Sequence, residues 1–468
     1  MRGLEIVEVN YSNIVINKDF RIDSDFWTKE PKRNPNLNYR KIGELLKEAQ
    51  YGISVSMNEE GIGYPIFRMN EIHNMLCDLD VDKHADISKE DFKKFKLNNK
   101  DVLFNRTNSY EWVGRTGIYY EVDNQDFVFA SYLVRFIPNE DYIYPEYLTA
   151  YLNTKYGVWD IKRRSRQSIN QTNVNPEEVK EIYIPLLSKI IQDRIKENFE
   201  QAHLCRIKSN RLYCDAENLL FDNLGVGDFK IQEEAINIKK YCESFATTGR
   251  LDAEYYQSEY ESYQKIIYGY SNGYELLKTA CCQKDSNFVP EDEIEYSYVE
   301  LADIGESGDI KGCTIAIGCE LPTRARRKVN TNDIIVSSIE GSLDSCALVT
   351  ESYDNALCST GFYVLSSSKI NSQTLLVLFK SQLMQNLLKR GCSGTILTAI
   401  NKTEFQNIPI PLIEERTQQK IKDKIKESFD LKKRSVELLE EAKLAVEIAI
   451  EFGEKNAIDY LNNKDNNE

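Results

Sequence analysis

Two short regions in the first half of the sequence combine cationic side chains with amides. One region contains Arg106, Thr107, Asn108 and Arg115, and the other contains Lys162, Arg163, Arg164, Arg166, Gln167, Asn170 and Gln171. A guanidinium can bind O6 and N7 of guanine, an amide can bind N6 and N7 of adenine, and any cation can contact phosphate. This mixture of residue types predicts contacts to DNA. Arg68 and Asn70, in the segment YPIFRMN, are further candidates.

The second half of the sequence offers a similar set of polar and basic residues. Its members are Arg324, Arg326, Arg327, Lys328, Ser337, Ser338, Lys389, Arg390, Ser393 and Thr395. The net charge of −15 at first argues against a nucleic-acid partner. Acidic residues, however, are concentrated in helix-like stretches such as 437–454, whereas 155–166 and 324–328 are basic. Because the charge is segregated, net charge decides little, although each basic residue alone also fits an exposed loop or a helix cap.

Signatures of catalysis and metal binding are missing from the sequence. It contains no GxxxxGK[ST] phosphate loop, no glycine-rich loop suited to S-adenosylmethionine, and no tetrapeptide like the (D/N)PPY of adenine methyltransferases. The pair Asn175 and Pro176 is better explained as a helix start. The 11 cysteines form no CxxC pair and there are only 3 histidines, which argues against zinc. We therefore predict a non-enzymatic chain with reduced thiols that itself binds no metal or cofactor.

The sequence contains an internal repeat. The matching stretches are RIDSDFW (21–27) with RLDAEYY (250–256), DVLFNRTNS (101–109) with DIIVSSIEG (333–341), IYIPLL (182–187) with IPIPLI (408–413), and IKENF (195–199) with IKESF (425–429), at offsets of 229, 232, 226 and 230 residues. Each match is weak alone. Their common order and nearly constant offset indicate an internal duplication.

Both halves use the same succession of elements. Apolar runs at 127–136 and 357–365 predict buried strands, and 145–163 and 373–390 predict helices. A long helix then closes each half. The second of these has a seam at steps of three and four that is apolar except for two lysines, through Ile421, Ile425, Phe429, Lys432, Val436, Leu439, Lys443, Val446 and Ile450. The first has a similar seam from Ile191, Ile195, Phe199 and Ala202, less regular through Ile207 and Leu212 to Leu219.

We therefore expect a mixed α/β (α+β) protein with two similar globular domains, two long helices packed on each other and a pseudo-twofold internal repeat. The expected parts are an N-terminal arm (1–20), a first globular domain (21–187), a first spacer helix (188–224), a linker with the second globular domain (225–413), a second spacer helix (414–454) and a polar tail (455–468). About 36 residues of helix would span roughly 54 Å, so the helices could set the distance between two reading domains.

This arrangement resembles the specificity subunits of type I restriction-modification enzymes. The resemblance covers roughly residues 20–452 and rests on YPIFRMNEI, DVLFNRTNSYEWVG, FASYLVRF, PEYLTAYLNTKYG, the IYIPLL–IKENF junction, RARRKVNTNDIIVSSIEGSLDS and IPIPLIEERTQQKI. It implies two target-recognition domains separated by antiparallel coiled-coil helices, each domain reading part of a bipartite double-stranded DNA site. The second half lacks an evident counterpart of YPIFRMN.

The resemblance also implies a division of labour with partners. Two methyltransferase subunits would dock on the helices and supply S-adenosylmethionine, and a restriction subunit, where the system has one, would supply ATP hydrolysis, Mg²⁺ and cleavage. Two other functions stay open: a self-contained nuclease or methyltransferase with a divergent active site, and a coiled-coil scaffold. The N-terminus lacks the apolar block of a signal peptide, and no apolar run approaches a membrane span, so we expect a cytoplasmic protein.

Overall fold

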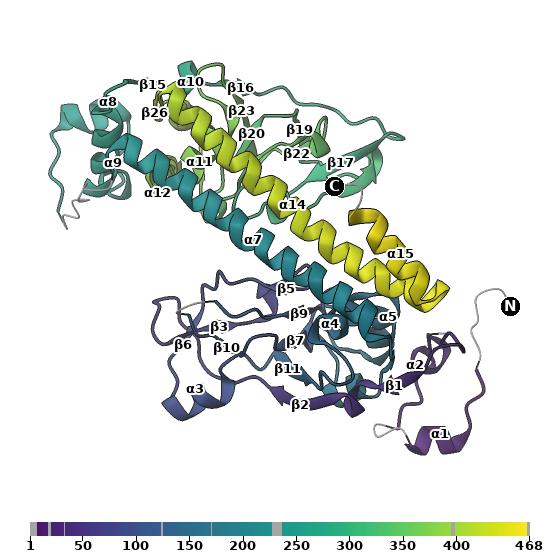
Figure 1. Ribbon diagram of the computed structural model, residues 1–468. Helices are drawn as coiled ribbons and strands as arrows, with labels where there is room; N and C mark the ends of the chain where they lie inside the picture. Colours follow the sequence, from purple (N-terminus) through teal and green to yellow (C-terminus); the bar gives the residue numbers. More distant parts are fainter. Residues whose placement is uncertain are drawn as a thin grey trace. The chain divides into compact units, whose positions relative to one another are not determined.

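The computed structural model describes residues 7–465, except for 17–19, 32, 123–124, 170, 227–235 and 395–397. The chain divides into two compact units. Unit 1 consists of Met1–Arg206 with Lys433–Glu468, and unit 2 is Ile207–Lys432. Each unit mixes helices with strands and contains one half of each long helix, α7 (Lys189–Leu224) and α14 (Glu415–Phe452) (Figure 1). The predicted mixed α+β class is confirmed.

A six-stranded sheet forms the centre of unit 1. Its order is β2 (Leu46–Tyr51), β11 (Leu133–Pro138), β7 (Val102–Asn105), β9 (Thr116–Ile118), β5 (Leu76–Cys77) and β4 (Ile72–His73). A three-stranded sheet has the order β10 (Val128–Phe129), β3 (Tyr64–Phe67) and β6 (His84–Ala85). All four residues of β7 are buried, as an apolar run covered on both faces requires. Helix α4 (Pro145–Asn153) packs on β9 and is followed by α5 (Lys155–Arg164).

Two four-stranded sheets form the core of unit 2. One has the order β16 (Cys282–Lys284), β23 (Phe362–Ser366), β20 (Ile334–Ser337) and β21 (Cys346–Leu348). The other has the order β18 (Thr314–Ile317), β17 (Glu295–Val299), β22 (Leu357–Ser359) and β19 (Ala325–Lys328). Helices α11 (Ser372–Lys380) and α12 (Gln382–Gly391) follow β23, as α4 and α5 follow β11.

Hydrogen bonds confirm the duplication. Strand β1 (Tyr39–Lys41) pairs with β14 (Tyr183–Pro185) as β15 (Tyr274–Leu276) pairs with β26 (Pro409–Pro411), both antiparallel. In unit 1, the Gln192 carboxamide accepts from the N–H of Tyr144 and donates to the carbonyls of Leu187 and Tyr142. In unit 2, Gln418 makes the same three bonds with other residues. The two glutamines thus fix the start of a long helix to the start of α4 and of α11.

Unit 2 does contain a counterpart of YPIFRMN, contrary to the sequence analysis. Strand β3 pairs in parallel with β10, and β17 pairs in parallel with β22. Each strand leads into a 3-10 turn closed by a carboxylate three residues on, Glu71 after Arg68 and Asp303 after Glu300. Sequence comparison missed the match because backbone pairing and a capping carboxylate define this element, and few of its side chains are shared.

The two basic segments, 155–166 and 324–328, do not occupy equivalent positions in the two units. Residues 155–166 cover α5, whose counterpart is α12, whereas 324–328 include β19 at the edge of a sheet. At the 232-residue offset, β19 corresponds to α3 (Lys89–Phe95). Insertions and exchanges between helix and strand therefore distinguish the two units around their shared core.

The long helices are antiparallel in both units, as predicted. In unit 1, Asn198 donates to the carbonyl of Leu438, and Ser435 donates to that of Ala202. In unit 2, Ser209 and Ser428 each donate to the carbonyl of the other. The order of these contacts runs in opposite directions along the two helices. Helices α7 and α14 have 36 and 38 residues.

The seam between these helices differs from the prediction near its middle. Ile207 and Val436 are 40% and 37% exposed, while Ser209, Ser428 and Ser435 are buried. Small hydroxyl side chains are tolerated here because each donates to a backbone carbonyl across the seam. An apolar periodicity cannot reveal such positions.

Shorter helices complete both units. They are α1 (Tyr11–Ile16), α2 (Ser24–Thr28), α6 (Pro176–Lys180) and α15 (Glu454–Asp465) in unit 1, and α8 (Phe245–Thr248), α9 (Ser258–Tyr268), α10 (Leu277–Ala280) and α13 (Lys402–Gln406) in unit 2. The segment expected as a polar tail is helical through α15, which buries Ala457 and Leu461. None of the described helices is long and apolar enough to cross a membrane.

Candidate nucleic-acid interface

In unit 1, the two polar regions singled out in the sequence meet in one small sheet. Its order is β12 (Arg166–Gln167), β13 (Thr172–Asn173) and β8 (Thr107–Asn108). Arg166 pairs with Asn173, which pairs with Thr107, and the Thr107 hydroxyl donates a 2.5 Å hydrogen bond to the Asn173 carboxamide. Thr107 is buried in this contact and therefore supports the sheet.

The outer strand of this sheet carries the accessible polar groups. Arg166 and Gln167 are exposed, Asn108 is half-buried, and Ile169 beyond them is 99% exposed. Ile169 and Asn173 were not among the predicted residues, although Ile169 lies between the predicted Gln167 and Asn170 and Asn173 lies two residues beyond Gln171. Asn170, also selected, lies outside the described residues.

Arg106 lies beside two tyrosines. Its guanidinium carbon is 5.2 Å from the centroid of the Tyr51 ring, and its backbone N–H donates to the backbone carbonyl of Tyr132. Tyr51 and Tyr132 are 47% and 38% exposed. The Tyr51 ring suits a cation–π contact with Arg106, but Tyr51 ends strand β2 and Tyr132 lies in the turn before β11, so only the fold brings them close to Arg106.

The loop after β8 is organised by Lys162. Its ammonium donates to the carbonyls of Tyr110, Glu111 and Val113, with distances of 3.0 Å to the last two. Burial lowers the Lys162 pKa to about 8. On the same loop, the guanidinium of Arg115 lies 3.4 Å from the centroid of the Trp112 ring. Lys162 is thus a support of the loop, whereas half-buried Arg115 stacks on an exposed indole.

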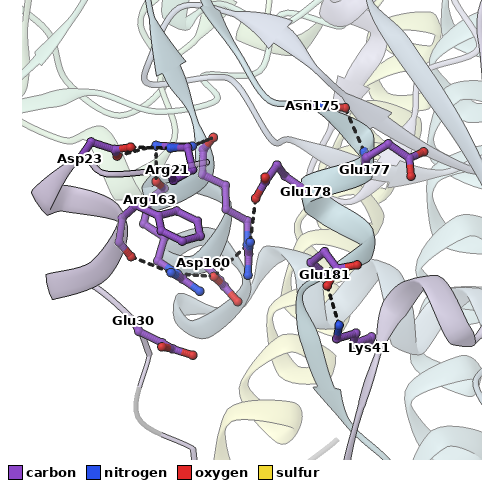
Figure 2. A network of polar contacts seen from close by, with 12 residues as sticks. Arg21, Asp23, Glu30, Lys41, Asp160, Arg163, Asn175, Glu177, Glu178 and Glu181 are labelled. Atoms are coloured by element: carbon purple, nitrogen blue, oxygen red, sulfur yellow. Dashed lines mark hydrogen bonds and ion pairs between the residues drawn. The ribbon is translucent and has the colours of Figure 1, made fainter. Parts of the chain in front are cut away.

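Arg163 and Arg164 lie inside a buried polar network. Figure 2 shows Arg163, Asp160 and Glu178 of this network. The side chains of Arg163 and Arg164 are 3% and 5% exposed, and both bind Asp160 Oδ1, at 2.5 and 3.1 Å. Arg164 also binds Glu178 at 2.9 Å, and Arg163 donates to the carbonyl of Phe26 at 2.7 Å. We withdraw both from the predicted DNA-contacting set, because breaking buried ion pairs to reach phosphate would leave Asp160 and Glu178 uncompensated.

The turn after β3 places Arg68 and Asn70 differently. Arg68 is 23% exposed and its guanidinium binds the buried Glu71 carboxylate at 2.7 Å. Asn70 is exposed at the tip of the turn. The Asn70 carboxamide is therefore accessible on this turn, whereas the Arg68 guanidinium is paired with Glu71.

In unit 2, the predicted residues fall into three groups. On and beside β19, Arg324 and Lys328 are exposed, whereas Arg326 and Arg327 are half-buried and donate to the carbonyls of Thr323 and Asp285. Ser337 is buried against Ser342, and Ser338 donates to Gly361. At the end of α12, Lys389 and Ser393 are exposed, and Arg390 donates to Tyr255. Thr395 lies outside the described residues.

A hairpin also follows α12, in the place that β12 and β13 occupy after α5. It pairs β24 (Cys392–Ser393) with β25 (Ala399–Ile400), and Ala399 forms a bridge with Ile339. Ile339 corresponds to Thr107 at the 232-residue offset. Both units thus present a hairpin from the end of a helix, paired to the continuation of a central strand.

The sequence matches the family described as "Type I restriction modification DNA specificity domain" twice, over residues 35–211 and 274–441. The chain belongs to this family. The two matched segments correspond to the two repeats, and each includes a globular part and the beginning of a long helix. As a member of a DNA-specificity family, the chain is a recognition component of a type I restriction-modification system and not its catalytic one.

The chain is also similar to known specificity subunits. The chain is 25% identical over 427 residues to the MjaX specificity subunit of a type I restriction enzyme of Methanocaldococcus jannaschii, covering 86% of this chain and 90% of the relative. It is 31% identical over 100 residues to the EcoKI specificity subunit of Escherichia coli, covering 21% of each chain. A solved S subunit from M. genitalium matches with a TM-score of 0.39 and 12% identity, covering 92% of this chain and 98% of that chain.

Within the described part of this specificity chain, no group of three or more His, Cys, Asp or Glu side chains could hold a metal ion. No disulfide joins the described cysteines. Burial raises the pKa of Cys281, Cys346, Cys358 and Cys392 to about 12. These four thiols are therefore poor nucleophiles at neutral pH.

Proposed function

We propose that each unit of this specificity chain reads one half of a bipartite sequence in double-stranded DNA. The observation that carries this proposal is the repeated hairpin: in both units it follows the end of a helix that is buried on one side, and it pairs beside a central strand. In unit 1 its outer strand exposes Arg166 and Gln167, which can bind guanine and adenine through paired hydrogen bonds.

The proposed DNA-contacting set keeps the accessible predicted residues. They are Asn70, Arg106, Asn108, Arg115, Arg166 and Gln167 in unit 1, and Arg324, Arg326, Lys328, Lys389 and Ser393 in unit 2. Asn170 and Thr395 stay predictions. Two further residues have a supporting role. Lys162 holds the loop after β8 by donating to three of its backbone carbonyls, and Thr107 donates to the Asn173 carboxamide within the small sheet.

We further propose that two methyltransferase subunits dock on the long helices and supply S-adenosylmethionine. Exposed apolar side chains on the unit 1 halves of α7 and α14 support such docking: Ile190, Leu204, Val436 and Leu444 are 37–66% exposed. A restriction subunit, where present, would add ATP hydrolysis and Mg²⁺-dependent cleavage. The chain itself would contribute DNA sequence recognition.

The test is to co-express the chain with its cognate methyltransferase in a host without adenine methylation, and to map methylated adenines. We expect a motif of two specified blocks separated by an unspecified gap. The double variant Arg166→Ala/Gln167→Ala should relax one block only. Arg40→Gln, which breaks a surface ion pair with Glu44 in the same unit, is the matched control and should leave both blocks unchanged. A contiguous motif, or equal relaxation of both blocks, would overturn the proposal.

A further inference from the structure

Arg21 ties the start of unit 1 to the end of helix α5. Its Nε and Nη2 bind both carboxylate oxygens of Asp23, at 2.5 and 2.6 Å. Its Nη1 and Nη2 donate to the carbonyls of Arg164 and Arg163, at 3.1 and 3.4 Å. The Trp27 indole N–H donates to the carbonyl of Arg21 at 2.8 Å, which holds the turn closed. Figure 2 shows Asp23 on one side of this guanidinium and the end of α5 on the other.

Unit 2 contains the same arrangement around Arg250. Its Nε binds Asp252 at 2.9 Å, and its Nη1 and Nη2 donate to the carbonyls of Gly391 and Cys392, at 3.4 and 2.9 Å. The hydroxyl of Tyr256, at the position of Trp27, donates to the carbonyl of Arg250 at 3.0 Å. These carbonyls lie at the end of α12, the counterpart of α5.

A second pair of bonds repeats in the opposite direction. Arg163 donates to the carbonyl of Phe26, and Arg390 donates to the carbonyl of Tyr255 at 3.1 Å. The two guanidinium groups also lie 4.6 and 4.3 Å from the ring centroids of Phe26 and Tyr255. We call each set of contacts, centred on Arg21 or on Arg250, a helix-end latch.

Physical chemistry explains the choice of residues in the latch. The last carbonyls of a helix have no partner within it, and a cation there also interacts favourably with the helix dipole. A carboxylate that binds a guanidinium through both oxygens fixes its orientation. The buried network around Asp160 is not repeated, since Leu387 occupies the corresponding position in α12. The latch is thus retained where the neighbouring ion pairs are not.

The position of the latch connects it with recognition. Strand β12 begins at Arg166, two residues after the end of α5, and β24 begins at Cys392, whose own carbonyl Arg250 binds. We propose that Arg21 and Arg250 are positioning residues, each of which sets the placement of its own unit's DNA-reading hairpin without touching DNA. This inference rests on the proposed function and adds to it two specificity determinants outside the hairpins.

The test measures discrimination by the full chain assembled with its methyltransferase. The rate of methylation of the cognate site is divided by the rate for sites with one base changed, separately for each block. Arg21→Gln should lower this ratio by about 5- to 150-fold in the block read by unit 1, the range expected for one lost base contact. The other block should keep its ratio. Arg250→Gln should lower the ratio in the block read by unit 2 and leave the ratio of the other block unchanged.

Controls separate positioning from stability and from failure of the proposed function. Arg40→Gln breaks a surface ion pair with Glu44 in unit 1 and should change neither ratio. Asp23→Asn keeps Arg21 and removes only the charge that orients it, so it tests the latch if Arg21→Gln fails to fold. A lower melting temperature with both ratios unchanged would overturn the inference alone. A wild-type complex that reads no bipartite site would overturn the proposed function and the inference with it.

Discussion

Replacing Arg164 with alanine should destabilise unit 1 and leave the electrostatics of DNA binding unchanged. The Arg164 side chain is 5% exposed and binds Asp160 and Glu178 at 3.1 and 2.9 Å. Removing one member of a buried ion pair leaves a charge without a partner and costs about 3–5 kcal/mol. For a domain of this size, each kcal/mol lowers the melting temperature by roughly 2–4 °C, so we expect a decrease of about 6–20 °C.

Calorimetry of the full chain measures this effect. Lys433→Ala removes an exposed ion pair and should cost under about 1 kcal/mol. The double variant Arg164→Met/Glu178→Leu should recover much of the loss, because it removes both charges of the pair. The salt dependence of DNA binding should be the same for Arg164→Ala and the wild type. A melting temperature like that of Lys433→Ala, together with a salt slope reduced by about one, would refute this account and return Arg164 to the phosphate contacts.

Three further predictions concern pH, partners and spacing. His203 stacks on Tyr120, and burial lowers the pKa of its imidazole to about 4. In the unfolded chain the same imidazole has a pKa of about 6.5. Between these two pH values only the unfolded chain binds the proton, so the stability of the folded chain should decline as the pH falls toward 4. Chemical denaturation of His203→Phe should show a smaller decline, and an equal one would contradict the assignment. The isolated chain, with its net charge of −15, should bind DNA weakly until the methyltransferase joins it, whereas nanomolar sequence-specific binding alone would contradict partner dependence. Four residues inserted between Lys432 and Lys433 add about 6 Å of helix. The unspecified gap between the two blocks of the methylated motif should therefore lengthen by about one or two base pairs. An unchanged gap with retained activity would mean that the helices serve only as a docking surface and do not set the spacing.

The sequence predicted the duplicated architecture because the repeat has strong periodic signals. The apolar run at 357–365 forms strands β22 and β23, and the predicted long helices form α7 and α14. The apolar periodicity fails where a polar side chain occupies a buried position between the two long helices. Ser435 replaces Val436 in the buried seam because its hydroxyl donates to a carbonyl of the facing helix. No periodicity of apolar residues encodes that bond.

The candidate interface was predicted less well, since residue type does not determine exposure. Arg163 and Arg166 look alike in sequence, yet Arg163 is buried against Asp160 and Arg166 is exposed. Arg163 lies within α5, whereas α5 ends at Arg164 and Arg166 lies on the edge strand β12. The role of Arg21 depends on carbonyls more than 140 positions away, which only the folded chain brings within reach.

The central claim is that each unit reads its own block of DNA. It is tested most directly by replacing residues 274–411 with residues 39–185, so that both globular parts come from unit 1. The junctions are equivalent, because Tyr39 pairs with Pro185 as Tyr274 pairs with Pro411. Methylation mapping with the cognate methyltransferase should then reveal a motif built from two copies of one half-site. A motif that keeps the original second block would contradict the claim.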